Sequence, residues 1–140
     1  AIKWPLPLKE LQPFEIDLLR KSEAVVHLAG ESIAGHRWNE STKKEIYQSR
    51  VHGTQELLKV LVESKNPGPR VIIMTSAVGY YGDANNQTLT ESSPAGHDFL
   101  SQVCVDWEKA LFEGPFSTSR KVALRIAMVL AKQGGALEKM

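Results

Sequence analysis

Three short apolar runs divide the chain, and each has the length of a β-strand. They occupy residues 24–29, 70–76 and 122–130. Apolar residues follow one another in these runs with little polar alternation, which is typical of strands buried on both faces of a parallel sheet. The hydrophobic pattern therefore predicts a parallel sheet at the centre of the fold.

Helical periodicity fills the segment between the first two runs. Apolar residues recur there at intervals of three and four positions, which predicts one long helix over residues 39–64. Asn39 or Ser41 can cap its start, and Thr42 and Glu45 have the spacing of a capping box.

Two other helices complete the predicted pattern. One is expected over residues 14–22, inside a proline-containing lead-in segment of residues 1–22, and the other over residues 99–112 with Asp98 as its cap. A loop over residues 79–96 precedes the last helix, and its length indicates a functional role. The alternation of strands and helices predicts an α/β fold, with right-handed crossovers and helices packed on the faces of the sheet.

Composition narrows the classes of function. The 140 residues include 42% hydrophobic and 24% charged residues, which are ordinary values for a globular domain. The net charge of +1 gives no electrostatic reason to expect nucleic acid or an anionic membrane as a partner. The single cysteine, Cys104, fits a reducing compartment, and no apolar run approaches the length of a membrane span. We therefore expect a cytoplasmic protein.

Several common motifs are absent from the sequence. The four histidines are scattered without metal-ligand spacing, so no metal site is expected. The chain has no G-x-S-x-G elbow for a nucleophilic serine. It also has no G-x-G and no G-x-x-x-x-G-K-[ST], so neither kind of phosphate-binding loop is present.

Chemistry-bearing side chains follow two of the predicted strands. Ligands of parallel α/β sheets bind beyond the carboxyl ends of the strands. The first strand is followed by Leu-Ala-Gly-Glu at residues 28–31, and the second ends in Thr-Ser-Ala-Val-Gly-Tyr-Tyr-Gly at residues 75–82. The hydroxyl of Ser76 and the phenols of Tyr80 and Tyr81 are therefore candidates for a site at this edge.

Six short motifs occur in an informative order. They are HLAG at 27–30, RWN at 37–39, SRVHGT at 49–54, TSAVGYYG at 75–82, ESSP at 91–94, and LR at 124–125 with GGAL at 134–137. Together they resemble the extended short-chain dehydrogenase/reductase superfamily. The closer resemblance is to its sugar-nucleotide epimerase-like branch, the NAD-dependent epimerase/dehydratases.

The resemblance implies a Rossmann-like fold of which this chain holds only part. Such proteins begin with a strand, a G-x-x-G-x-x-G turn and a helix, and they end in a smaller substrate domain. Residues 1–140 contain neither, so we expect them to be the central part, or second half, of an NAD(P)-binding domain. The full-length protein would bind NADP or NAD, and this chain alone would bind it weakly or not at all.

The resemblance also places the cofactor contacts. Gly30 would let the backbone approach the cofactor without an intervening side chain, although a plain turn at the strand end is an alternative. The implied cofactor-binding residues lie at the ends of the first two strands: Leu28, Ala29, Gly30, Glu31, Thr75, Ser76, Ala77 and Tyr81.

The catalytic residues of the superfamily map only in part. The usual acid/base tyrosine, with a lysine four positions later, has no counterpart near residues 99–107, because the nearest candidates there are Leu100 with Cys104, or Gln102 with Asp106. Ser76 or Thr75 can hold a substrate oxygen, although strict spacing puts Ala77 at that position. Tyr80 can substitute as acid/base and line the substrate pocket; the alternative is that Tyr80 only lines the pocket and Tyr81 packs against the sheet edge. Ser76 and Tyr80 are therefore the candidate catalytic residues.

Other charged and aromatic residues have two interpretations each. Arg37 and Trp38 match a signature of the branch and would bind a substrate phosphate or carboxylate, or else Trp38 staples the long helix. Glu91 is expected to anchor the loop, and Arg125 to pair near the end of its strand with a partner that the sequence does not identify. Trp107 and Cys104 are expected in the core.

Two functions fit these residues. The first is a fragment of an NAD(P)-dependent oxidoreductase of the nucleotide-sugar epimerase/dehydratase type, acting on a small molecule such as a nucleotide sugar, with a homodimer as the candidate assembly. The alternative is a catalytically inactive NAD(P)-binding regulatory or interaction module, which the missing tyrosine–lysine dyad favours.

Overall fold

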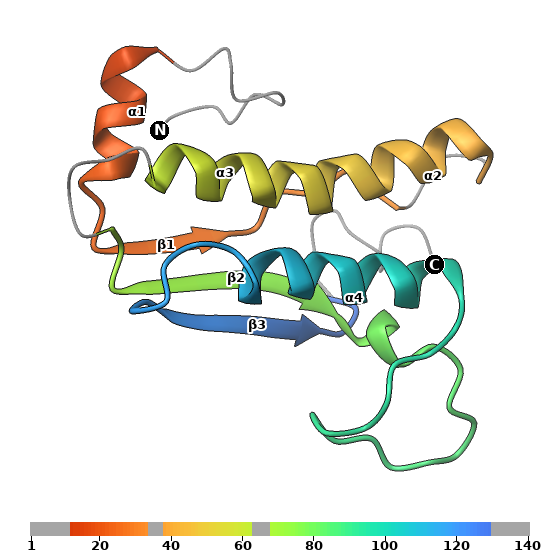
Figure 1. Ribbon diagram of the computed structural model, residues 1–140. Helices are drawn as coiled ribbons and strands as arrows, with labels where there is room; N and C mark the ends of the chain where they lie inside the picture. Colours follow the sequence, from red (N-terminus) through yellow and green to blue (C-terminus); the bar gives the residue numbers. More distant parts are fainter. Residues whose placement is uncertain (1–11, 34–37, 63–67, 130–140) are drawn as a thin grey trace.

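A computed structural model of the chain describes residues 12–33, 38–62 and 68–129. Its centre is a three-stranded parallel sheet in the order β1-β2-β3. The strands are β1 (Ala24–His27), β2 (Val71–Ala77) and β3 (Arg120–Ile126), and they point the same way (Figure 1). The parallel sheet predicted from the apolar runs is confirmed.

The third strand begins and ends earlier than its hydrophobic run predicts. It was expected over residues 122–130, but it starts at Arg120 and ends at Ile126, and residue 130 lies outside the described residues. Pairing explains the shift, because β3 is in register with all of β2, from Arg120 beside Val71 to Ile126 beside Ala77. The hydrophobic signal misses the first two residues because they are charged.

A long helical rod connects the first two strands. It consists of α2 (Glu40–Tyr47), a π-helical turn η2 (Gln48–His52) and α3 (Gly53–Val62). In Figure 1 these three elements form one continuous rod above the sheet. The long helix predicted from periodicity is therefore confirmed as far as Val62, with a π turn in its middle that the periodicity did not indicate.

The rod begins at Asn39, one of its two predicted caps. The Asn39 side chain accepts a hydrogen bond from the Thr42 amide at 2.9 Å. Thr42 thus lies inside the helix, and the capping box predicted between Thr42 and Glu45 is wrong. The Glu45 carboxylate instead accepts a hydrogen bond from the Ser41 hydroxyl at 3.1 Å.

The other two helices agree with the sequence. Helix α1 (Pro13–Arg20) begins one residue before the predicted range of residues 14–22 and ends two residues short of its end, and α4 (Phe99–Phe112) has the predicted bounds. Asp98 caps α4 by accepting a hydrogen bond from the Ser101 amide at 2.8 Å. This bond lowers the pKa of the Asp98 carboxyl, because it stabilises the charged form.

Helices α3 and α4 cover one face of the sheet, and the core lies between them and the strands (Figure 1). The prediction that the strands are buried on both faces is wrong for the described residues. Along β1, Val25 and His27 are buried whereas Val26 is 59% exposed. The strands are apolar enough to be buried on both faces, but no element within the described residues covers the second face of the sheet. The core residues are Val25, Val51, Leu57, Leu58, Leu61, Ile72, Met74, Trp107 and Leu111.

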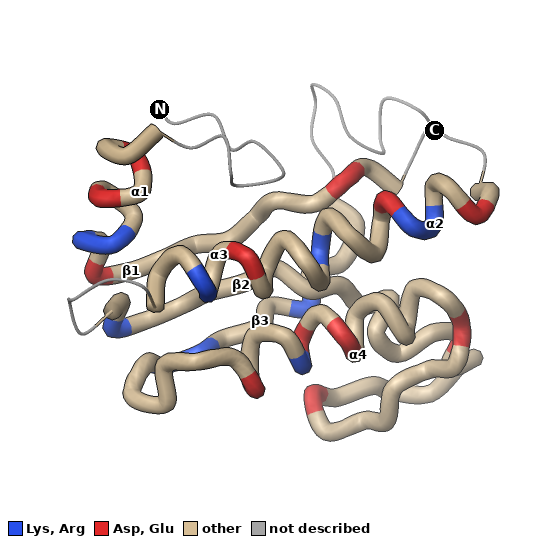
Figure 2. Tube along the Cα trace, turned by 45° about the horizontal axis from the view of Figure 1, so that its top comes forward, with Lys and Arg blue, Asp and Glu red and all other residues tan. Residues whose placement is uncertain are grey.

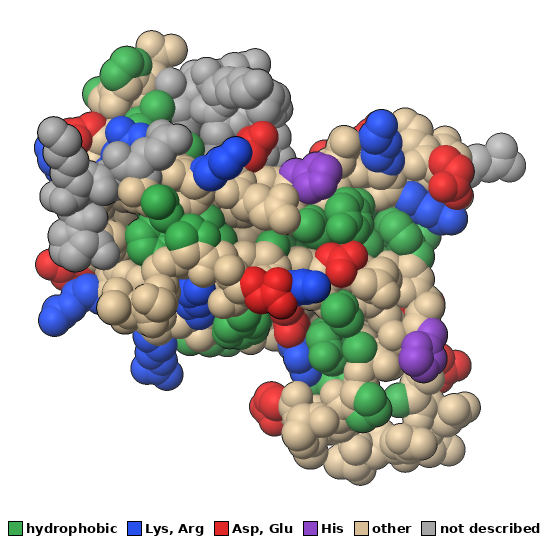
Figure 3. Space-filling model, viewed as in Figure 1, with side chains coloured by type: hydrophobic (Ala, Val, Ile, Leu, Met, Phe, Trp, Pro, Cys, Tyr) green, Lys and Arg blue, Asp and Glu red, His purple; other side chains and the backbone are tan. Residues whose placement is uncertain are grey.

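Charged residues are distributed evenly over this fold. Lys and Arg alternate with Asp and Glu along the trace (Figure 2). On the face seen in Figure 3, acidic and basic side chains lie beside one another rather than in patches of one sign. Among the described residues, no helix combines the length and the apolar character needed to cross a membrane.

Candidate functional site

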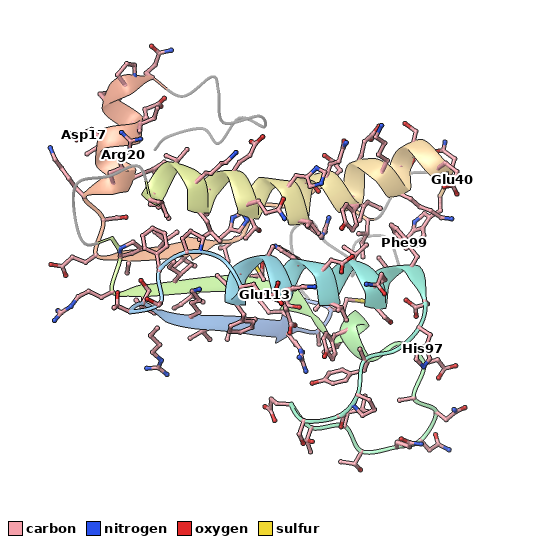
Figure 4. All side chains as sticks on the ribbon, viewed as in Figure 1. Asp17, Arg20, Glu40, His97, Phe99 and Glu113 are labelled. Atoms are coloured by element: carbon pink, nitrogen blue, oxygen red, sulfur yellow. The ribbon has the colours of Figure 1, made fainter. Side chains whose placement is uncertain are left out.

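The carboxyl ends of the strands, the loop after β2 and the start of α4 come together at one end of the molecule. Strand β2 continues into a 3-10 turn, η3 (Val78–Tyr81), and an irregular loop then leads to α4. Figure 4 shows His97 and Phe99 at this end, where the loop joins α4. The Thr75 hydroxyl ties the ends of β1 and β2 together by donating to the His27 carbonyl at 3.3 Å.

Ser76 lies on the helix-covered face of the sheet. Its side chain is buried, and its hydroxyl donates to the Glu108 carboxylate on α4 at 2.7 Å. Side chains alternate along a strand, so Thr75 and Ala77 point to the opposite face, where both are half-buried. The Ser76 hydroxyl is thus engaged inside the protein, while its two neighbours line the more open side.

Arg125 and Glu108 form a two-pronged ion pair beside Ser76. Arg125 Nε lies 2.9 Å from Glu108 Oε1, and Nη2 lies 2.8 Å from Oε2. The side chains are only 18% and 9% exposed. The hydrogen bond with Glu108 raises the pKa of Arg125. The sequence predicted a partner for Arg125 near the strand end, and Glu108 is that partner.

The same guanidinium holds both tyrosines of the 3-10 turn. Arg125 Nη1 donates to the Tyr81 hydroxyl oxygen at 2.8 Å and to the main-chain carbonyl of Glu91 at 3.1 Å. Its Cζ lies 3.5 Å from the centre of the Tyr80 ring, a cation–π contact. Glu91 therefore anchors the loop through its backbone, whereas its side chain is exposed.

The end of β1 lies against the π turn of the rod. The Glu31 amide donates to the Ser49 hydroxyl at 3.0 Å. A Cβ atom at Gly30 would lie 3.2 Å from Cζ of Arg50, so glycine permits the close approach of this guanidinium. Of the other predicted cofactor contacts at this strand end, Leu28 is exposed and Ala29 is half-buried.

Behind the strand ends, three polar side chains meet inside the core. Nε2 of His27 lies 3.0 Å from the Thr54 hydroxyl oxygen, which also accepts a hydrogen bond from Trp107 Nε1 at 2.8 Å. Burial lowers the pKa of His27 to about 4, so the imidazole is neutral at neutral pH. This arrangement confirms that Trp107 belongs to the core.

The predicted substrate-binding pair is described only in part. Arg37 lies outside the described residues. The Trp38 side chain is 46% exposed; its Nε1 donates to the Ile33 carbonyl at 3.2 Å, and its ring meets Phe99 edge-on at 6.1 Å between centroids. Trp38 therefore joins the segment before the rod to the start of α4.

Residues 99–107, where the superfamily's tyrosine–lysine dyad was expected, contain no tyrosine and no lysine. Cys104, one of the candidates there, is 5% exposed, and burial raises the pKa of its thiol. Cys104 thus belongs to the core, as predicted. The described residues contain no group of histidine, cysteine and acidic side chains that could hold a metal ion.

Sequence reasoning missed two features of this site: the residue Glu108, and the contacts that the Arg50 guanidinium makes. Glu108 had a usable signal, because it lies four positions after Cys104 and directly after Trp107, on the helix face expected to be buried. An acid on a buried face requires a partner, and Arg125 was an arginine in the interior of a predicted strand. Arg50 had no such signal, because its surroundings depend on the π turn.

Comparison with known proteins gives a consistent result. The profile of the NAD dependent epimerase/dehydratase family matches residues 15–100. An epimerase family protein of Mycobacterium leprae is 35% identical over 127 residues, which are 91% of this chain and 40% of that protein. The chain spans about two fifths of the length of the first curated relatives that it matches.

Two solved structures resemble the fold closely. The human epimerase family protein SDR39U1, solved with NADPH, has a TM-score of 0.77 and 33% identity, covering 89% of this chain and 44% of that one. The nucleoside-diphosphate sugar epimerase of Corynebacterium glutamicum has a TM-score of 0.74 and 38% identity, covering 98% of this chain and 29% of that one.

Proposed function

Because the chain belongs to the NAD-dependent epimerase/dehydratase family, we propose that it forms the central part of an NAD(P)-binding oxidoreductase of the extended short-chain dehydrogenase/reductase type. The observation that carries the proposal is the meeting of the β1 and β2 ends with η3 and α4 at one edge of a parallel sheet. Ligands of such sheets bind at this edge.

The open side of the sheet supports the idea of a central part. Within the described residues, β1 pairs with β2 alone, and an apolar groove of about 450 Å³ runs along β1. A further strand from the parent protein would pair with the free backbone groups of β1, and covering helices would bury the open face of the sheet. The exposed apolar residues on and beyond the strands include Val26, Leu28, Leu124, Ile126, Met128 and Val129.

The cofactor would lie across the ends of β1 and β2. Gly30 is exposed and carries no side chain, and Thr75 and Ala77 line the open face beside it. When bound, the nicotinamide supplies hydride transfer, and these residues shape the surface that orients it. The full set proposed to contact it is Leu28, Ala29, Gly30, Glu31, Thr75, Ser76, Ala77 and Tyr81.

A nucleotide sugar is the substrate class best supported. The Corynebacterium glutamicum relative is a nucleoside-diphosphate sugar epimerase, and it shares 38% identity with this chain. Tyr80 is proposed as the acid/base on the substrate side, with Arg125 fixing its ring, and Ser76 as its neighbour in the catalytic group. Arg37 and Trp38 complete the proposed substrate contacts.

A second candidate is an inactive NAD(P)-binding regulatory module. One observation favours it: residues 99–107, where the usual catalytic dyad is expected, contain no tyrosine and no lysine. The two candidates share the cofactor and differ in turnover alone.

Titration of the full-length parent with NADPH and NADH, followed by fluorescence, tests the cofactor. Turnover is then assayed on panels of nucleotide sugars and carbonyl compounds for the wild type, Ser76→Ala and Tyr80→Phe. Tight binding with turnover that Tyr80→Phe abolishes supports the enzyme, and tight binding with no turnover supports the module. Absence of binding overturns both. Sedimentation of the same protein tests the proposed homodimer, and fractionation of cells the proposed cytoplasmic location.

A further inference from the structure

Arg50 places a positive charge at the ligand-binding edge of the sheet. It lies in the π turn of the rod, packed against Gly30 just beyond the end of β1. Its Cζ lies 5.3 Å from the centre of the Trp107 ring on α4. The guanidinium is therefore held between β1 and α4, where the strand ends meet.

Most of the hydrogen-bonding capacity of this guanidinium is unused. An arginine has five N–H donors. Arg50 Nη1 makes two long contacts, 3.3 Å to the Ile46 carbonyl and 3.4 Å to the Ser49 hydroxyl. Within residues 12–33, 38–62 and 68–129, Nε and Nη2 have no acceptor, and Arg50 forms no ion pair. Arg125 differs, because Glu108, Tyr81 and Glu91 occupy all three of its nitrogens.

The contacts that Arg50 makes within the fold use only part of its guanidinium. Burial lowers the pKa of Arg50, with opposing contributions from Cys104 and Glu31, so the protein bears a cost for placing the charge here. The contact with the Ile46 carbonyl is also dispensable, because the Ser49 hydroxyl already donates to that oxygen at 3.0 Å. A half-buried cation with an unpaired Nε–Nη2 edge is suited to a planar pair of oxygens.

We propose that Arg50 binds an oxyanion of the ligand, a carboxylate or phosphate group, through its Nε and Nη2 atoms. The inference rests on the proposed function in that the group belongs to the cofactor or to the substrate bound at this edge. Gly30 contributes by leaving the face of the guanidinium free of a side chain.

The test compares Arg50→Met with the wild type in the full-length parent protein. Methionine keeps much of the apolar volume and removes the donors. Arg20→Met is the matched control, because Arg20 also donates to a carbonyl of the rod, that of Val60 at 3.0 Å. Figure 4 shows Arg20 on α1, beside the end of the rod opposite Glu40, so the control contacts α3 and not the π turn that holds Arg50.

Three quantities are measured for each protein. The first is the unfolding temperature without ligand. The second is the dissociation constant for NADPH and for NADH. The third is the rise in unfolding temperature caused by inorganic phosphate or acetate, with chloride at equal ionic strength as reference, with and without saturating NADPH.

The expected result is a loss of binding with unchanged or higher thermal stability. If the oxyanion is on the cofactor, Arg50→Met weakens NADPH binding about tenfold or more, as for the loss of a charge-assisted pair. If it is on the substrate, NADPH binding is retained and the response to phosphate or acetate in the NADPH complex disappears. Arg20→Met changes neither the binding of NADPH nor the response to phosphate or acetate.

Other outcomes overturn the proposal. Retention of NADPH binding together with the anion response shows that Arg50 holds no ligand. A fall in stability that matches the fall in binding shows that Arg50 only supports the π turn. If the wild type binds neither dinucleotide, the proposed function fails on its own, and the anion response without cofactor still decides whether Arg50 binds an oxyanion.

Discussion

At the scale of single residues, Arg125 joins parts of the candidate site that are distant in sequence. It pairs with Glu108 on α4, holds Tyr81 in the 3-10 turn, and reaches the backbone of Glu91 in the loop. The sequence located Arg125 near a strand end but identified none of these contacts. Each depends on how α4 and the loop fold back over β3, which no local pattern records.

Arg125→Met is expected to destabilise the protein by about 3 kcal/mol, because it leaves the Glu108 carboxylate buried without its counter-charge. The free energy of unfolding in urea measures this effect. The double variant Glu108→Leu with Arg125→Met should recover at least half of the loss, since it removes both charges. If the double variant is as unstable as the single one, loss of packing rather than of charge is responsible.

His27 predicts a pH dependence of stability. Its pKa is about 4 in the folded protein and about 6.5 in the unfolded chain, so as the pH falls the unfolded chain takes up the proton first. The stability present above pH 6.5 is therefore lost between about pH 6.5 and 4, by about 3 kcal/mol in total. His27→Gln keeps a polar partner for Thr54 and should lose this part of the pH dependence. Equal pH slopes for both proteins in urea unfolding would contradict the prediction.

At the scale of elements, the sequence predicted most of the fold. Helix α4 and its Asp98 cap follow from periodicity and capping rules alone. The π turn η2 was missed because one extra residue in a long amphipathic helix hardly alters the apolar stripe. The register of β3 was missed because pairing with β2, rather than its own composition, sets its start at Arg120.

The junction between η3 and α4 is packed too closely for a side chain at Gly96. A Cβ atom there would lie 2.7 Å from the Tyr81 carbonyl oxygen and 2.8 Å from Gly82 Cα. Gly96→Ala should therefore destabilise the protein by about 1–3 kcal/mol, as overpacking does. Gly79→Ala is the control, because its nearest neighbour, Leu100 Cβ, is 3.8 Å away. Equal unfolding temperatures for the two variants would sink the explanation.

At the scale of the whole molecule, the sheet has one covered and one open face. The apolar runs were interpreted as strands buried on both sides, and the described residues supply a layer for one side only. An apolar composition predicts that both faces of a strand are buried, but it does not identify the segments of the protein that cover them. The sequence likewise predicted which edge of the sheet holds the candidate site. It could not identify Glu108 as the partner of Arg125, because that contact depends on tertiary structure.

The isolated 140-residue chain is expected to bind NADPH at least about 100-fold more weakly than the full-length parent, a difference of about 2.7 kcal/mol. The reason is that the chain contains no G-x-G turn to bind the pyrophosphate. Calorimetric titration of both proteins at the same salt concentration measures the ratio. Micromolar binding by the isolated chain would show that the strand ends alone provide most of the affinity.

The π turn η2 also bears on the rotational phase between the two halves of the rod. A π turn holds about one residue more than an α-helical turn, so removing one residue from Gln48–His52 would let the turn close as α-helix while α3 keeps its phase relative to α2. One residue removed from the regular start of α3 would instead rotate Leu57, Leu58 and Leu61 by about 100°, away from the sheet. Insertions and deletions in this rod are therefore tolerated only where they preserve both phases, the one that aims Arg50 at the ligand edge and the one that aims α3 at the core.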